Sequence, residues 1–200
     1  MLEIVIATRN PHKVRELAGL LRVRGIRWRS LAEFPRAHPA REDGRSFEVN
    51  AIKKAQAAAR ATGLPALADD SGVEIDALGG LPGVRSARFA GAHGDDAANI
   101  RAVLRAMRQV PTGMRGARYR CALALCDARR VLALTRGSWR VQVAKRPAGR
   151  GGFGYDPIML VPRLKKTVGQ MAAAPKQRLS HRAMASRRMQ PRLRRLITRR

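Results

Sequence analysis

Cysteine, aromatic and acidic residues are all scarce in this sequence. Only 2 of its 200 residues are cysteine, and Phe, Trp and Tyr together make up 4%. Cys121 and Cys126 are five positions apart in what reads as one strand, so their side chains point to opposite faces and cannot easily bridge. The sequence has no CxxC pair and no Cys/His cluster at zinc-binding spacing. A disulfide framework and a structural zinc site are therefore unsupported, and we expect two core thiols.

Long hydrophobic runs are missing as well. Apolar stretches such as Leu2–Ala7 and Val131–Leu134 are far shorter than the ~20 residues that a membrane-spanning helix needs. An acidic Glu3 stands where a secretory signal would carry positive charge, and no small-residue cleavage site follows. We therefore expect no membrane segment and a cytoplasmic protein. Apolar residue types still make up 45% of the chain, which is enough for one folded domain over residues 1–200.

Negative charge is far outnumbered, because 41 Lys and Arg residues face 14 Asp and Glu residues, a formal net charge of +27. The densest basic run forms a C-terminal tail at about residues 187–200. Such an excess attracts nucleic acid or phosphate-bearing small molecules, but an arginine-rich genome would also scatter arginine over any surface. Few aromatic side chains are available to stack single-stranded bases. Charge alone leaves both interpretations open, and non-specific nucleic-acid binding remains among the expected interactions.

The hydrophobic pattern alternates between strand-like and helix-like segments, which predicts an α/β or α+β fold. Arg22–Arg45 lacks clear periodicity apart from a strand-like run at Ile26–Trp28, and we expect it to be mostly loop. Asp69 and Asp70 are expected in a turn after a short strand. Strands are expected at Leu2–Thr8, Pro65–Ala68, Val73–Ala77, Tyr119–Cys126 and Val131–Val143, the last two as a hairpin, and helices after Asn10, Ser46 and Ser180 and over Ala97–Met107.

Acidic pairs and one basic loop could bind a metal ion and phosphates. Glu42-Asp43 precedes a helix and Asp69-Asp70 follows a strand, and Mg²⁺ prefers such carboxylates together with phosphate oxygens. An Asp-Asp-Ser-Gly run is also ordinary turn chemistry. The loop Thr8–Lys13 leads into a helix N-terminus, where backbone N–H groups favour a phosphate, although it equally fits an ordinary strand-to-helix turn.

Two later segments could contact a nucleotide. Gly149–Pro157 places two aromatic residues among glycines, which could stack a base or plug the core. Ser180-His181-Arg182 supplies hydrogen-bond donors, although a histidine beside an arginine is by default a surface pair. The P-loop, HExxH and GxSxG motifs are absent, so the hydrolases that use them lose support.

Taken in order, five segments resemble the inosine triphosphate pyrophosphatase family, whose members act on noncanonical purine nucleoside triphosphates. The resemblance runs from about residue 3 to about residue 190, and its longest motifs are ADDSG-x-x-x-D-x-LGG-x-PG-x-x-SAR and GGFGYDP. The segments are ATRNPHKVREL, EDGRSFEVNAIKKA, LADDSGVEIDALGGLPGVRSARFAG, GSWRVQVAKRPAGRGGFGYDPI and SHRA.

The resemblance implies an α/β fold with an elongated mixed β-sheet flanked by helices, as two lobes around a central nucleotide cleft. It implies a Mg²⁺-dependent hydrolase that cleaves dITP/ITP or XTP/dXTP between the α- and β-phosphates, releasing a monophosphate and pyrophosphate. Such an enzyme cleanses the nucleotide pool, and members usually form homodimers.

By position, the resemblance makes Glu42 and Asp70 the metal ligands and Asp70 the catalytic base that activates water. The implied substrate contacts begin with the phosphate loop and end with the contacts to the purine. They are Thr8, Arg9, Asn10, Pro11, His12, Lys13, Ser71, Phe153, Gly154, Tyr155, Asp156, Lys176, His181 and Arg182.

The sequence departs from the family pattern at a few positions. Arg9 replaces a common glycine, where a side chain could restrict a positive φ, crowd the phosphates or add a phosphate contact. Gln170 replaces an acidic residue, Ala183 replaces a glycine, and Arg140-Val141 occupies a stretch that usually contains glycine. The departures leave two alternatives open: a catalytically weakened member that binds nucleic acid through its basic surface, and an enzyme with another nucleotide preference, such as modified pyrimidines.

Overall fold

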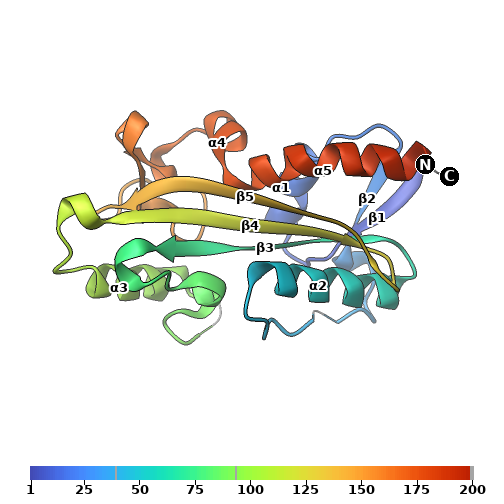
Figure 1. The fold of residues 1–200 in the computed structure, drawn as a ribbon, viewed down its shortest axis with the longest axis horizontal. Helices are drawn as coiled ribbons and strands as arrows, with labels where there is room; N and C mark the ends of the chain where they lie inside the picture. The colour runs from blue at the N-terminus through green and yellow to red at the C-terminus, as the bar shows by residue number, and fades with distance from the viewer. Residues whose placement is uncertain (39, 93, 199–200) are drawn as a thin grey trace. The chain divides into compact units, whose positions relative to one another are not determined.

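The computed structural model describes residues 1–38, 40–92 and 94–198, and only the backbone of His12. Its strands form a mixed seven-stranded sheet in the order β2-β1-β3-β4-β5-β6-β7, with helices beside it (Figure 1). The strands are β1 Leu2–Ile6, β2 Ile26–Ser30, β3 Ala66–Ile75, β4 Gly116–Cys126, β5 Val131–Val143, β6 Met159–Val161 and β7 Lys166–Thr167. The helices are α1 Pro11–Leu20, α2 Phe47–Thr62, α3 Asp96–Ala106, α4 Ala173–Leu179 and α5 His181–Thr198.

The chain divides into two compact units. Unit 1 comprises Met1–Asp70, Cys121–Gly137 and His181–Arg200, and unit 2 comprises Ser71–Arg120 and Ser138–Ser180. The α/β fold class and the mixed sheet are confirmed, whereas a nucleotide cleft between two lobes stays a prediction. Arg199 and Arg200, the end of the expected basic tail, lie outside the described residues. Among the described residues, no helix is both long and apolar enough to cross a membrane.

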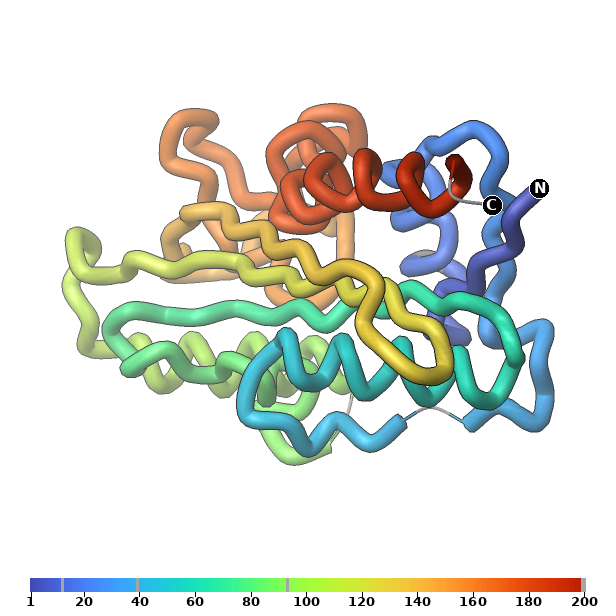
Figure 2. The backbone as a smooth tube through the Cα atoms, turned by 45° about the vertical axis from the view of Figure 1, so that its right-hand side comes forward, coloured from blue at the N-terminus to red at the C-terminus, as the bar shows by residue number. Residues whose placement is uncertain are grey.

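Unit 1 has a three-layer arrangement that follows from side-chain alternation along β1. Ile4 and Ile6 pack in a core with residues of α1 and α5, whereas Val5, between them, packs in a second core with residues of α2. Figures 1 and 2 show α1 beside α5 on one face of the sheet and α2 on the other. β1 pairs in parallel with both β2 and β3, so β1, which leads into the β1–α1 loop, has a strand neighbour on each side.

Unit 2 is built around a separate core. Val103 of α3 and Met107, which caps this helix, belong to one core with Ile75, Tyr119 and Trp139. Tyr119 and Trp139 stack with their ring centroids 5.9 Å apart. The hairpin prediction is confirmed, because Asp127 N donates to Arg130 O at 3.1 Å between β4 and β5.

The expected helix boundaries follow from local capping. The Ser46 side chain accepts a hydrogen bond from the backbone N–H of Val49 at the start of α2, and Gly63 adopts the left-handed conformation that ends it. The expected helices after Asn10 and Ser180 and over Ala97–Met107 are likewise present. Within the segment expected to be mostly loop, β2 extends to Ser30.

The prediction of a turn at Asp69 and Asp70 is wrong, because β3 runs without interruption from Ala66 to Ile75. Both carboxylates are buried in the middle of this strand. Adjacent acidic residues normally indicate an exposed turn, since burying an unpaired charge is costly. Here cations from other elements compensate the buried charge, and the local sequence does not reveal them.

Candidate functional site

The β1–α1 loop is shaped by its own side chains. Thr8 Oγ1 accepts a hydrogen bond from Asn10 N at 3.2 Å, and Asn10 Oδ1 accepts one from Lys13 N at 3.3 Å. Pro11, which lacks an N–H, occupies the first position of α1, where no N–H partner is required. The side chain of His12 lies outside the described residues. The loop therefore brings a helix N-terminus and Lys13 together, an arrangement that favours an anion.

Arg9 connects this loop to the segment that precedes Glu42. Its Nη2 donates to the backbone oxygens of Pro35 at 3.2 Å and Ala37 at 2.9 Å. Among the described non-glycine residues, only Lys165 has a positive φ. The backbone at Arg9 therefore does not have the positive φ that favours glycine, and its side chain does not strain the loop.

Asp70 and Glu42 converge on one lysine. Lys54, on α2, places its Nζ 2.7 Å from Asp70 Oδ1 and 2.9 Å from Glu42 Oε1. The exposed fractions of the Lys54 and Asp70 side chains are 11% and 9%. Because Asp69 and Asp70 are adjacent in a strand, their side chains point to opposite faces, and Asp70 faces α2.

Burial and charge oppose each other in this pair. Burial is the largest effect on Asp70 and raises its pKa, although the Lys54 ammonium opposes the rise. Burial alone would lower the pKa of Lys54, but the carboxylates of Asp70 and Glu42 outweigh it and raise that pKa. The lysine is therefore held as a cation between two carboxylates.

Asp69 pairs with cations on the other face of the sheet. Its Oδ2 accepts from Arg182 Nε at 3.2 Å and from the Cys121 thiol at 3.2 Å, and Lys13 Nζ lies 3.7 Å from its Oδ1. Arg182, on α5, also reaches Glu16 Oε2 at 3.5 Å. Burial disfavours the charge on Arg182, but Asp69 and Glu16 outweigh burial and raise its pKa. The proposed purine ligand Arg182 is thus buried in two ion pairs.

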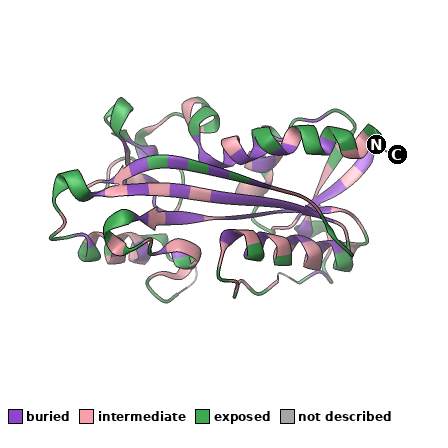
Figure 3. Cartoon of the chain, in the orientation of Figure 1, coloured by how far each residue is buried: buried purple, intermediate pink, exposed green. Residues whose placement is uncertain are grey.

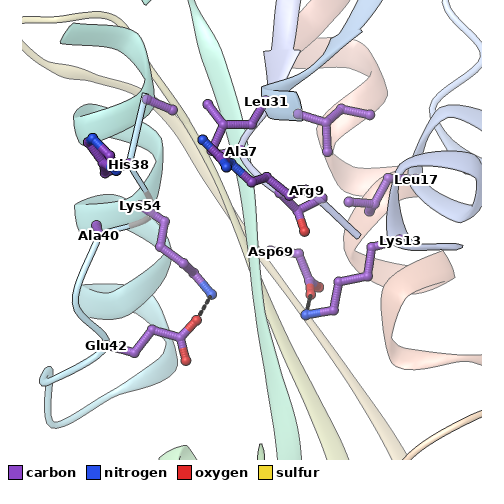
Figure 4. Close-up of a pocket in the computed structure, with 13 residues that line it drawn as sticks. Ala7, Arg9, Lys13, Leu17, Leu31, His38, Ala40, Glu42, Lys54 and Asp69 are labelled. Carbon is purple, nitrogen blue, oxygen red and sulfur yellow. Dashed lines mark hydrogen bonds and ion pairs between the residues drawn. The ribbon is translucent and has the colours of Figure 1, made fainter. Parts of the chain in front are cut away.

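A cavity of about 130 Å³ in unit 1 is lined by Arg9, Lys13, Glu42, Lys54 and Asp69, among other residues (Figure 4). Figure 4 shows Lys54 bonded to Glu42 at one side and Lys13 paired with Asp69 at the other. The charged or titratable lining residues are Arg9, Lys13, His38, Glu42, Lys54 and Asp69. Arg9, Lys13 and Lys54 outnumber the carboxylates of Glu42 and Asp69 around this cavity, and this excess of basic side chains suits an anionic group with several oxygens.

Glu42 and Asp70 fit a hard divalent cation. The described residues contain no group of three or more His, Cys, Asp and Glu side chains placed to hold a metal. Both carboxylates nevertheless reach the same point, which the Lys54 ammonium now occupies. One or two carboxylates completed by water and phosphate oxygens is the ligand set that Mg²⁺ commonly uses.

In unit 2, Asp156 organises the glycine-rich loop. Its carboxylate accepts from Tyr119 OH at 2.6 Å and from Phe153 N at 3.1 Å, and it pairs with Lys176 Nζ at 2.5 Å. Gly152 has a positive φ, and a Cβ there would lie 2.0 Å from Asp156 Oδ2. Only glycine therefore fits at this position.

The two aromatic residues of that loop have different environments. Phe153 is 42% exposed, and Lys176 Nζ lies 5.0 Å from its ring centroid. Tyr155 is buried, and its OH donates to Ser86 O at 2.8 Å. Gly154 N donates to Asp96 Oδ2 at 2.6 Å. One aromatic side chain thus fills the core, and the other is exposed with a lysine over its ring.

Glycine also positions the start of α5, which carries His181 and Arg182. A Cβ on Gly137, in β5, would lie 1.9 Å from the His181 backbone oxygen. The missing side chain lets the helix N-terminus lie directly against the strand. Both His181 and Arg182 are buried there.

The departures from the family pattern fit their surroundings. Gln170 Oε1 accepts from Thr167 N at 3.0 Å, so a neutral amide suffices. Arg140 Nη1 donates to Asp76 Oδ2 at 3.0 Å on the surface. Ala183 is fully buried, without an assigned role for its methyl group.

Sequence reasoning missed several residues that hold this machinery in place. Lys54 and Tyr119 contact the acidic residues Asp70 and Asp156, and Cys121 contacts Asp69. Lys54 lies within the segment EDGRSFEVNAIKKA, whose resemblance to the family was the only feature of the sequence that pointed to a role for this lysine. Two adjacent aspartates buried in a strand need a cation on each face of the sheet. This requirement predicts that cationic partners exist, but it does not identify them.

Comparisons with known proteins match one family over nearly the whole chain. A family model described as the Ham1 family matches residues 4–192. A relative from Geobacillus kaustophilus (strain HTA426), named dITP/XTP pyrophosphatase, is 47% identical over 185 residues, covering 92% of this chain and 91% of the relative. The structure of a HAM1 protein from Coxiella burnetii has 39% identity and a TM-score of 0.89, covering 98% of this chain and 100% of that chain. The Staphylococcus aureus Ham1 protein has 35% identity and a TM-score of 0.86, covering 96% and 98%.

Proposed function

The chain belongs to the Ham1 family, and we propose that it hydrolyses noncanonical purine nucleoside triphosphates, dITP/ITP and XTP/dXTP, to the monophosphate and pyrophosphate. It is a nucleoside-triphosphate pyrophosphatase. The observation that carries this function is the 47% identity, over 92% of the chain, to a relative named dITP/XTP pyrophosphatase. A catalytically weakened nucleic-acid binder is not favoured, because Glu42, Lys54 and the β1–α1 loop line a charged cavity, Asp70 pairs with Lys54, and Arg9 has no positive φ.

The unit 1 residues supply the phosphate chemistry. We propose that Glu42 and Asp70 would hold Mg²⁺ as the cofactor, which would neutralise phosphate charge when bound. Lys13, Lys54 and the N-terminal N–H groups of α1 bind phosphate oxygens. Asp70, whose pKa burial raises, accepts a proton from the attacking water. The water oxygen bonds to the α-phosphorus as the α–β phosphoanhydride bond breaks, and pyrophosphate leaves.

The remaining substrate contacts belong to the same proposal. The exposed ring of Phe153, with Lys176 against it, can accept a base or sugar. A 6-oxo purine accepts hydrogen bonds, so donors on His181 or Arg182 favour hypoxanthine over adenine. We further propose contacts from Ser71 and from the loop residues Gly154, Tyr155 and Asp156. A homodimer and a cytoplasmic location are proposed on the family resemblance alone.

A pyrophosphate-release assay with and without Mg²⁺ tests the function. It compares dITP and XTP with dATP, dGTP, dUTP and methylated pyrimidine triphosphates, and it identifies the nucleotide product. We expect Mg²⁺-dependent, preferential conversion of dITP and XTP to monophosphates. Preference for a pyrimidine triphosphate would instead support an enzyme of the same fold with another substrate.

Asp70→Asn tests the catalytic assignment. Loss of the general base should lower kcat by about 10²–10⁴-fold while the thermal melting curve persists. Asp43→Asn is the matched control, because Asp43 is also acidic but pairs with the exposed Lys53. Full turnover by the Asp70 variant contradicts its role as base, and equal losses in both variants would point to a general charge effect.

A further inference from the structure

A basic groove lies between β5 and α5 in unit 1, apart from the residues proposed for hydrolysis. Its volume is about 490 Å³. The lining residues, which we call the basic groove, are Leu134, Thr135, Arg136, Arg188, Pro191, Arg192 and Arg195.

Helical spacing explains why the arginines form a line. Ala185, Met189 and Leu193 recur every four residues and are buried in the core, which fixes the inner face of α5. Arg188, Arg192 and Arg195 recur at helical spacing on an outer face, which Figure 3 shows as exposed. At ~1.5 Å per residue, the three arginines extend over about 10 Å of helix.

Few acidic side chains of the protein compensate the positive charge of the basic groove. Arg136 Nε pairs with Glu48 Oε1 at 2.6 Å, and Arg188 Nη1 donates to the Arg136 backbone oxygen at 2.8 Å. Within residues 1–38, 40–92 and 94–198, the guanidinium groups of Arg192 and Arg195 make no hydrogen bond or ion pair. α5 itself contains no acidic residue. Several guanidinium groups therefore face solvent with one carboxylate among them.

This arrangement favours one class of ligand. A line of separated guanidinium groups matches a row of phosphates better than a single small anion. No aromatic residue lines the groove, so unpaired bases would find no surface on which to stack. We propose that the basic groove binds the phosphate backbone of a nucleic-acid duplex, without sequence preference, as an activity separate from nucleotide hydrolysis.

Fluorescence anisotropy with a short labelled DNA duplex, titrated with the full chain at several KCl concentrations, tests the proposal. The groove variant is Arg192→Gln with Arg195→Gln. The matched control is Arg101→Gln with Arg105→Gln, which removes the same charge from exposed positions of α3. Glutamine is a good helix former, so both variants should retain the fold.

The groove variant should bind the duplex at least about tenfold more weakly, and the slope of log K against log salt should fall by about 1.8. The control should change the affinity for the duplex less than about twofold, because it removes the same charge from positions outside the groove. A larger effect would mean that net charge alone drives binding. Both variants should hydrolyse dITP at the wild-type rate. If the groove variant does not fold, Arg192→Gln alone should lower the slope by about 0.9.

Three results would overturn the proposal. The first is equal weakening in the groove variant and the control, which would mean that the excess charge acts without a site. The second is tighter binding of a single strand of the same length than of the duplex. The third is binding to vesicles of anionic lipid without binding to the duplex, which would assign the groove to a membrane surface instead.

Discussion

At the scale of single residues, the cation on Lys54 makes the acidic part of the cavity stable. Two carboxylates, one of them almost fully buried, share its ammonium at 2.7 and 2.9 Å. Without a cation, Asp70 and Glu42 would repel each other in a partly dry environment. A bound divalent cation could replace the lysine in this function, which links stability to metal binding.

Lys54→Met should therefore destabilise the protein by about 3 kcal/mol at neutral pH, measured by urea denaturation, because it leaves a buried carboxylate unpaired. Added Mg²⁺ should restore more stability to this variant than to the wild type. The deficit should also shrink on acidification, because burial raises the pKa of Asp70 and the Lys54 ammonium opposes that rise. Without Lys54, folded Asp70 should take up its proton at a higher pH than in the wild type and lose its unpaired charge.

Lys53→Met provides the control, since Lys53 pairs with Asp43 on the surface. Such exposed pairs contribute little because water and salt screen them. A Lys54 variant that is as stable as this control, with no added effect of Mg²⁺, would argue against a shared cation site.

At the scale of elements, the contact between β5 and the first turn of α5 positions His181 and Arg182. Gly137 makes this contact possible, because any Cβ would meet the His181 backbone oxygen at 1.9 Å. Backbone cannot move aside as a flexible side chain can. The position of the helix, and with it the Arg182–Asp69 ion pair, therefore depends on one missing side chain.

Gly137→Ala should cost about 2 kcal/mol or more in the free energy of unfolding, because the helix must shift away from the strand. Gly113→Ala is the comparison, since a Cβ there meets nothing within 4 Å and no positive φ is involved. We expect thermal denaturation to separate the two variants clearly. Similar melting temperatures would show that α5 can relax without loss.

At the scale of the whole molecule, both cysteines are reporters of global unfolding. Cys121 and Cys126 are free and buried. Burial is the main cause that raises the pKa of Cys126 to about 11, so little of the reactive thiolate exists at neutral pH.

A thiol reagent at pH 8 should label neither cysteine of the native protein at an appreciable rate. Labelling should instead accelerate with urea in parallel with the loss of circular dichroism, because exposure requires unfolding of the sheet. Fast labelling of a protein that retains its native circular dichroism would contradict the buried placement of these thiols.

Local periodicity, capping residues and long motifs were enough to predict a mixed α and β fold, the capped helix α2, the β4–β5 hairpin and the family, and the family resemblance narrowed the class to α/β. Three features needed the folded chain: Asp69 and Asp70 lie within a strand, Lys54 joins Asp70 to Glu42, and Arg9 binds the backbone at Pro35 and Ala37. The physical reason is that a buried charge is stabilised by partners distant in the sequence. Arg182, for example, lies 113 positions from Asp69, and no local pattern records that pairing.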